Sequence, residues 1–182
     1  MSGAGSYKVS PAFFSGRMER MSMGLEYDVA IYLLSAEFFA AYPESLFPEL
    51  MHKEGRPYAC LLINTHCGYF ICIPFRSSIN HKNAYLFSES SRSRRTRSGL
   101  DYSKMAIIQD KTYIDSVSTP VIDQDEYTEM MRNISEIVRA AGNYVDTYIG
   151  HIRGTSPLHQ REYTRKYQFS TLPYFHDILK LT

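Results

Sequence analysis

The stretch YACLLINTHCGYFICIP, residues 58–74, decides the fold because it contains two apolar runs joined by a short connection. The runs at 58–65 and 69–74 have the length and composition of strands. The segment 66–68 between them is short enough for an antiparallel hairpin, in which Gly68 supplies an unusual backbone angle. Because both runs are almost continuously hydrophobic, we expect central strands of a compact, highly curved antiparallel sheet or small barrel.

A second group of elements flanks this hairpin. The apolar run at 27–34 predicts another strand, and Ser35 is placed to cap a short helix over 36–42, which Pro43 would end. Shorter apolar segments predict further strands at 84–87, 105–108 and 113–114. The mixture of strands and helices indicates an α+β fold with peripheral helices.

The longest periodic segment runs from 123 to 151, where apolar residues recur at spacings of three and four. This pattern predicts one long amphipathic helix with an acidic opposite face. The chain beyond it is interpreted as a basic connection at 161–166 and a final short helix ending at Leu181. No internal repeat or linker divides the apolar blocks, so we expect one domain over 25–182, preceded by a flexible extension at 1–24.

Charge is unevenly distributed along the chain, although the net charge of the 182 residues is only +1. Residues 76–104 contain seven Lys or Arg and two acids, whereas residues 121–147 contain six acids and two Arg. A chain divided in this way can present one positive face to a polyanion such as nucleic acid while it remains near neutral overall.

The composition argues against several classes of protein. No apolar stretch is long enough to span a membrane, and the N-terminus lacks the pattern of a secretory signal. The three cysteines, Cys60, Cys67 and Cys72, lie in or beside apolar runs at spacings that match no zinc site. We therefore expect reduced thiols in a cytoplasmic protein without cofactor or metal, and we expect the dispersed histidines at the surface or at helix caps.

Chemically useful side chains follow the second strand of the hairpin, in the segment RSSINHK at 76–82. RNA carries its own nucleophile, the 2′-hydroxyl, so a protein needs only to align it, move two protons and stabilise charge on the phosphorane. Arg76 can hold two phosphate oxygens, His81 can exchange protons near neutral pH, and Lys82 can add charge or act as an acid. Ser77 can orient the phosphate or the 2′-hydroxyl.

The predicted catalytic residues are therefore Arg76, Ser77, His81 and Lys82, and this route requires no metal. Phosphate contacts are predicted from a further set of polar and basic side chains around the same segment. These residues are Ser78, Asn80, Arg92, Arg94, Arg95, Arg97 and Lys104. The alternative interpretation is an ordinary polar turn beside a solvated run of charge.

Four segments of the sequence form a combined pattern: GRPYA at 55–59, IPFRSSINHK at 73–82, GLDYSKMA at 99–106 and YQFSTL at 167–172. In this order and at these spacings they resemble the toxins of type III toxin–antitoxin systems. The resemblance is closest to the TenpN branch, which is related to ToxN and to the phage-abortive protein AbiQ.

This resemblance implies a curved antiparallel sheet like that of the MazF and Kid ribonucleases. It implies a metal-independent endoribonuclease that cleaves single-stranded RNA, such as a target mRNA, and leaves 2′,3′-cyclic phosphate and 5′-hydroxyl ends. A small repeated RNA antitoxin would fill the same groove and form a toxin–RNA hetero-oligomer. Tyr85 and Tyr102 would stack on the splayed bases of this RNA.

The resemblance also carries over individual catalytic positions. Ser77 stands where the family has its catalytic Ser. The family's Thr and Lys positions hold Arg76 and Ile79 in this chain. His81 or Lys82 would therefore supply the missing proton transfer.

Two other functions fit the same residues. One is an RNA-binding protein without catalysis, in which basic side chains such as Arg76, Lys82 and Lys104 only hold phosphates. The other is a small barrel that binds a protein partner through its acidic helix. Substitution of His81 or Ser77 would abolish cleavage only if the chain is an enzyme, and protein binding would depend only weakly on salt.

Overall fold

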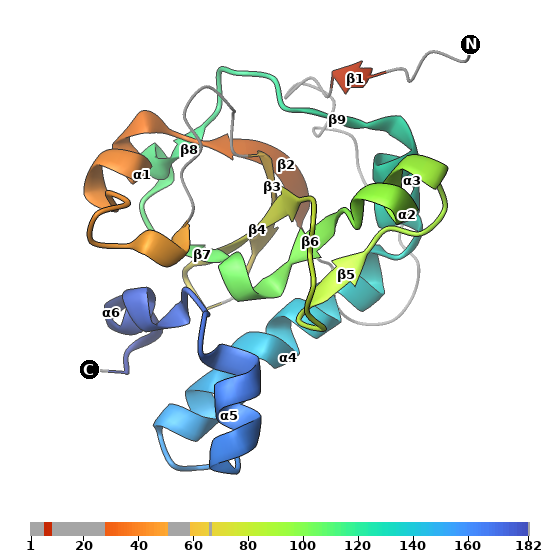
Figure 1. Cartoon of the computed structure of the whole chain (residues 1–182). Coiled ribbons are helices and arrows are strands. Elements are labelled where there is room, and N and C mark those ends of the chain that lie inside the picture. Colours follow the sequence, from red (N-terminus) through yellow and green to blue (C-terminus); the bar gives the residue numbers. More distant parts are fainter. Residues whose placement is uncertain (1–5, 9–27, 51–58, 66, 182) are drawn as a thin grey trace.

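The computed structural model describes residues 6–8, 28–50, 59–65 and 67–181 (Figure 1). Within them, a seven-stranded antiparallel sheet forms the centre of an α+β protein. Its strand order is β5-β6-β4-β3-β2-β8, and β7 pairs with β4 outside this path. The strands are β2 (Val29–Leu34), β3 (Ala59–Asn64), β4 (Phe70–Arg76), β5 (Ala84–Leu86), β6 (Gly99–Asp101), β7 (Ala106–Ile108) and β8 (Ile114–Asp115). A separate pairing joins β1 (Ser6–Lys8) to β9 (Val121–Asp123).

The predicted hairpin is confirmed and forms the middle of the sheet. β3 and β4 pair in antiparallel register with Leu62 opposite Cys72, and Gly68 in the connection has the predicted positive φ, 81°. Every residue over 60–63 and over 71–74 is buried. Because successive side chains of a strand point to opposite faces, both faces of these two strands are covered.

The expected strong curvature and barrel closure are wrong. The sheet is open and not strongly curled, and β5 and β8 at the two ends of the strand order do not pair with each other. A continuous apolar run does not distinguish a strand rolled inside a barrel from one that helices cover on both faces, because both kinds are buried on both sides. The outer strands, two or three residues long, are also too short to roll around the core.

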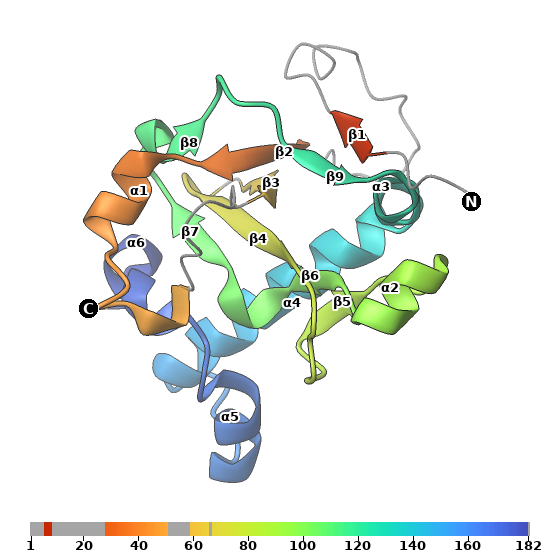
Figure 2. The same cartoon turned by 45° about the horizontal axis from the view of Figure 1, so that its top comes forward.

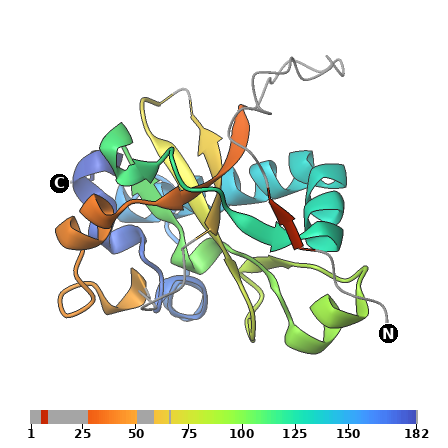
Figure 3. The same ribbon diagram turned by 90° about the horizontal axis from the view of Figure 1, so that it is seen from above.

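Helices cover the sheet on both sides. α4 (Ile134–Ile152) crosses behind the sheet in Figure 1, and in Figure 3 α1 (Ala36–Ala41) and α2 (Ser91–Thr96) lie toward the other side. The remaining helices are α3 (Gln124–Arg132), α5 (Gln160–Tyr167) and α6 (His176–Leu179), with 3-10 turns η2 (Pro48–Leu50), η3 (Tyr102–Lys104), η4 (Lys111–Tyr113) and η5 (Leu172–Phe175).

The predicted strand before Ser35 and the helix after it are both confirmed as β2 and α1. The hydroxyl oxygen of Ser35 accepts a hydrogen bond from the backbone N–H of Phe38 at 3.3 Å, so the cap is the predicted one. The short predicted strands are found as β5, β7 and β8, and the final short helix is found as α6.

The predicted long helix is confirmed in position but is interrupted at Asn133. α3 ends and α4 begins at this residue, whose side-chain amide donates to the Glu129 carbonyl at 2.8 Å. Asn side chains compete with the helix for nearby backbone groups, so they are favoured at helix ends. The apolar spacing continues across the break, and periodicity alone therefore could not reveal it.

The segment predicted as a basic connection at 161–166 is instead helical. His159 caps α5, because its Nδ1 accepts a hydrogen bond from a backbone N–H two residues later at 3.2 Å. Tyr163 and Tyr167 lie four residues apart and pack their rings against Tyr148 of α4. Charged and neutral polar residues fill the other positions, which hides the helical period in the sequence.

The first 24 residues contain no predicted element, whereas Ser6–Lys8 forms β1. The rest of this segment lies outside the described residues, and its predicted flexibility stays a prediction. Among the helices that the structure describes, none is both long and apolar enough to cross a membrane.

Candidate functional site

The polar residues of the candidate site lie where the strand beside β4 is interrupted. β6 and β7 pair end to end with one edge of β4 (Figure 2). Between these pairings, Ile73 and Pro74 of β4 face the five residues 101–105, of which Tyr102–Lys104 leave the sheet as η3. Proline has no N–H to donate to a ladder, so Pro74 is tolerated at such an irregularity. The interruption turns polar side chains toward the end of β4.

The carboxylate of Asp101 is the centre of this site and has no exposed surface. Its Oδ1 accepts hydrogen bonds from the Ser103 hydroxyl at 2.7 Å and from the Ser103 backbone N–H at 2.9 Å. Its Oδ2 forms an ion pair with the Arg76 guanidinium and lies 3.3 Å from Nε2 of His81. Four residues from three segments of the chain therefore meet at one buried carboxylate.

His81 is the titratable group of this cluster that a ligand can reach, because 37% of its side chain is exposed. Its Nε2 also lies 3.4 Å from the Ser103 hydroxyl, while its Nδ1 is buried without a hydrogen-bond partner in the described part of the chain. Asp101 and Ser103 thus approach the same ring nitrogen. A Ser-His-Asp triad needs them on different nitrogens, so this arrangement is not such a triad.

The loop after β4 presents the other predicted catalytic groups. Ser77, Ser78, Asn80 and Lys82 are all exposed. The loop is fixed by the buried Ile79 between them and by hydrogen bonds to the end of α2: backbone N–H groups at 78 and 79 donate to carbonyls at 96 and 97. Ser78 has a positive φ of 59°, which marks the sharp turn. The structure thus brings Arg76 and His81 together and leaves the hydroxyls and the ammonium beside them.

Tyr102 and Lys104 lie next to Asp101 in η3, but both are buried. The Lys104 ammonium forms an ion pair with Glu49 and donates to the Phe169 carbonyl at 2.8 Å. Burial raises the pKa of Tyr102 well above the usual tyrosine range. In this state of the protein, both residues are packed into the structure beneath the site.

Tyr85 lies in β5 and contacts α3. Its hydroxyl donates to the Glu129 carboxylate at 3.4 Å. Burial, followed by the charge of Glu129, raises the pKa of Tyr85 to about 12. The predicted stacking residue is therefore half-buried and neutral at physiological pH.

The predicted acidic face of α3 meets the predicted arginine run. The Arg92 guanidinium lies 3.1 Å from both Asp123 and Glu126, and Glu126 also accepts the hydroxyls of Ser93 and Ser98 at 3.3 and 2.5 Å. Opposite charges separated in sequence therefore neutralise each other between α2 and α3, where the sequence suggested a free positive face.

The other arginines of the run differ in their contacts. Arg94 donates to the Ser88 carbonyl at 2.7 Å, and Arg97, in a left-handed conformation, donates to the Ile79 carbonyl at 2.8 Å. Arg95 is exposed and has no hydrogen bond or ion pair within the described ranges. Arg95 is thus the arginine of α2 that remains most available to a phosphate.

Sequence reasoning did not select Asp101, Ser103 or Glu49. The first two stand two residues apart in the segment DYSK, and an Asp that accepts a backbone N–H two residues later is a common start for a short helical turn. That local pattern was available in the sequence, but it did not predict that His81 would lie beside it.

Among the described residues, no group of three or more His, Cys, Asp or Glu is arranged to hold a metal ion. Fold and geometry define an α+β protein with an ion-paired His–Asp–Ser–Arg cluster at the end of a central strand. Comparison with protein-family models, curated proteins and solved structures finds no match for this chain.

Proposed function

We propose that the chain is a metal-independent endoribonuclease, the toxin of a type III toxin–antitoxin system. The observation that carries the proposal is the contact of the partly exposed His81 with the buried Asp101, beside Arg76 and an exposed polar loop. A proton-exchanging imidazole next to a guanidinium is the pair of groups that RNA transphosphorylation needs. We propose that the chain shares with MazF and Kid an α+β architecture built on an antiparallel sheet.

In the proposed reaction, the 2′-oxygen forms a bond to phosphorus while the bond from phosphorus to the 5′-oxygen breaks. The proton of the 2′-hydroxyl passes to the imidazole of His81, and Asp101 stabilises the imidazolium that forms. Lys82, exposed on the same loop, delivers a proton to the departing 5′-oxygen.

Charge on the phosphorane requires a cation in the site. The bond between Arg76 and Asp101 uses one of the five guanidinium N–H donors, so others remain to contact phosphate oxygens. The exposed hydroxyls of Ser77 and Ser78 can orient the same phosphate. A small structured RNA that occupies this site would block it, which is the proposed mode of inhibition.

The test compares the full chain with His81→Asn in the cleavage of a mixed single-stranded RNA, with excess EDTA and with analysis of the product ends. His159→Asn is the matched control, because His159 is exposed and caps α5, a role that Asn also fills. We expect discrete fragments with 2′,3′-cyclic phosphate ends from the wild type and His159→Asn. His81→Asn should lose at least about 10²-fold in rate, as for removal of a general acid or base.

Equal cleavage by His81→Asn would keep the nuclease but remove His81 from its chemistry. Salt-dependent RNA binding by all three proteins without any cleavage would instead support the non-catalytic RNA-binding alternative. If the wild type neither cleaves nor binds RNA, the proposed function is overturned.

A further inference from the structure

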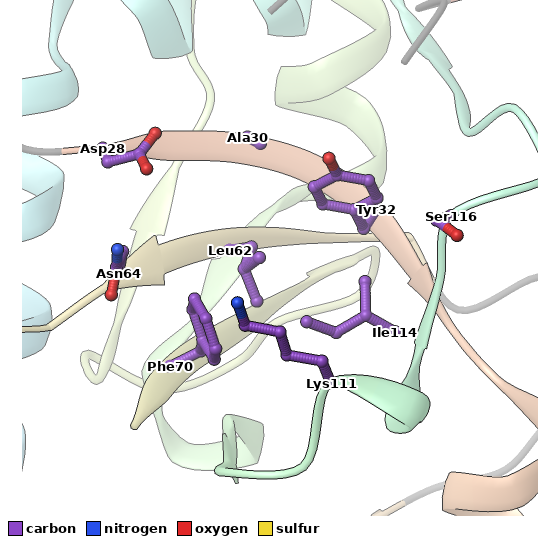
Figure 4. A pocket seen from close by; sticks show the side chains of 9 residues that line it. All are labelled: Asp28, Ala30, Tyr32, Leu62, Asn64, Phe70, Lys111, Ile114 and Ser116. Atoms are coloured by element: carbon purple, nitrogen blue, oxygen red, sulfur yellow. The ribbon is translucent and has the colours of Figure 1, made fainter. Parts of the chain in front are cut away.

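A pocket of about 500 Å³ lies on the sheet at the end of β4 opposite to His81 (Figure 4). Its floor consists of side chains from one face of β2, β3 and β4, and its wall is the segment from η4 to the residue after β8. The lining residues are Asp28, Ala30, Tyr32, Leu62, Asn64, Phe70, Lys111, Ile114 and Ser116. This volume is in the range of sites that hold small organic molecules.

The pocket is apolar in the middle and polar at its rim. Leu62 is buried at its floor, and the rings of Phe70 and Tyr32 stand on either side. Figure 4 shows the Lys111 side chain extending from η4 toward Leu62 and Phe70. An apolar slot beside an ammonium suits a flat ring that carries an anionic group.

Three polar side chains of the rim make no contacts that hold the described part of the fold together. The side chains of Asp28, Asn64 and Lys111 have no hydrogen bond or ion pair within the part of the chain that the structure describes. Asp28 and Asn64 are nevertheless neighbours, because the Asn64 backbone N–H donates to the Asp28 carbonyl at 3.0 Å. A carboxylate, an amide and an ammonium thus converge on one pocket without partners among the described residues.

We propose that this pocket binds a single nucleotide of an RNA strand whose base carries an exocyclic amino group. The base lies against Phe70 and Leu62, the amino group donates to Asp28, and Lys111 contacts the phosphate. The Asn64 amide offers one donor side and one acceptor side to the base edge. This inference rests on the proposed function, because it identifies a second contact for the RNA.

The position of the pocket makes it a site separate from the His81 cluster. Phe70 and Arg76 lie six residues apart in β4, which corresponds to about 20 Å at about 3.3 Å per residue. Their even spacing places both side chains on the same face of the strand. The pocket and the end of β4 that carries Arg76 therefore lie toward the same side of the sheet.

The experiment measures the binding of 5′-mononucleotides to the full chain by isothermal titration calorimetry. A mononucleotide has no phosphodiester bond to cleave, so binding is read independently of nuclease activity. Lys111→Gln is compared with Arg139→Gln, which removes the same charge from an exposed position of α4 behind the sheet. A second variant, Phe70→Leu, removes the ring but keeps an apolar side chain.

We expect the wild type and Arg139→Gln to bind AMP, GMP and CMP more tightly than UMP. Lys111→Gln should weaken this binding about tenfold or more, as for a lost hydrogen bond to a charged group, and Phe70→Leu should weaken it as well. No binding by the wild type, or equal binding by Lys111→Gln, would overturn the inference. If the wild-type protein binds no mononucleotide but cleaves RNA, the inference about the pocket fails and the proposed function stands. If it binds mononucleotides but does not cleave RNA, the pocket stands and the proposed function fails.

Discussion

Nε2 of the partly exposed His81 lies 3.3 Å from Oδ2 of Asp101, a carboxylate with no exposed surface. The same oxygen receives the guanidinium of Arg76. The negative charge of Asp101 therefore holds two cationic or potentially cationic groups at the end of β4. Asp101 is a positioning residue in this arrangement, because it is buried and acts through His81 and Arg76.

Asp101→Asn should lower kcat by about 10²-fold, since the amide keeps the shape but cannot stabilise the imidazolium. KM should change much less than kcat, because the loss falls on the transition state. Steady-state cleavage of a defined RNA measures both. Urea unfolding of the same variant should show a loss of about 1–3 kcal/mol, because the Arg76 ion pair is gone. An unchanged kcat in a folded variant would remove Asp101 from the chemistry.

Glu129→Gln should destabilise the protein by about 1–3 kcal/mol without touching the His81 cluster. The buried carboxylate accepts the backbone N–H groups of Ser88 and Glu89 at 3.0 Å, and so holds the segment that leads into α2. A glutamine has only one acceptor oxygen and directs an NH₂ group at these donors. Urea unfolding measures the loss.

Glu44→Gln is the control for this variant, because Glu44 is exposed and forms no ion pair among the described residues. Its free energy of unfolding should stay within about 0.5 kcal/mol of the wild type. Equal stability of Glu129→Gln and Glu44→Gln would mean that the Glu129 hydrogen bonds do not stabilise the α2 segment.

The hairpin at the centre of the sheet could be predicted from the sequence because its signals are local. A run of apolar residues, a glycine at the turn and a serine before a helix act through neighbours in the chain. The curvature of the sheet could not be predicted in this way, since it depends on what covers each face. α2 was missed for a related reason: SRSRRT has no apolar stripe, and the helix is held by the Ser90 cap and by Glu126.

The centre of the candidate site illustrates the same limit. Asp101 lies 25 residues from Arg76 along the chain, and only the antiparallel register of β4 and β6 brings the two together. The predicted loop at 76–82 contains two groups of the cluster, Arg76 and His81, but the carboxylate that organises them comes from a different segment. Because β6 was not among the predicted strands, the pairing of these opposite charges could not be predicted from the sequence.

Gly99→Ala should destabilise the protein by about 3 kcal/mol or more, because a Cβ at this position would lie 2.1 Å from the Tyr85 carbonyl oxygen. The backbone of β5 would have to separate from β6 to make room. Gly142→Ala is the matched control: no atom lies within 4 Å of its Cβ position in α4, so it should stabilise by about 0.5–1 kcal/mol. Thermal unfolding of both variants checks the contrast, and a loss shared by both would contradict it.

Because several tyrosines are buried, we expect the protein to lose stability at alkaline pH. Burial is the first cause that raises the pKa of seven of them above the ordinary value of 10.0, to about 12 for Tyr69 and Tyr85. The seven are Tyr42, Tyr69, Tyr85, Tyr102, Tyr144, Tyr148 and Tyr167. Well below pH 10 these hydroxyls are protonated in both states. Above it, the unfolded chain releases protons that the folded chain keeps, so the free energy of unfolding falls as pH rises from about 10 to 12.

Tyrosinate absorbance measures this effect directly and does not respond to lysine titration. At pH 11 the folded chain should contain clearly fewer ionised tyrosines than the chain in urea, and the difference should disappear as the protein unfolds. The free energy of unfolding should be almost constant from pH 7 to about 8.5 with respect to these groups. Identical absorbance curves for the folded and the unfolded chain would mean that the buried hydroxyls are open to solvent.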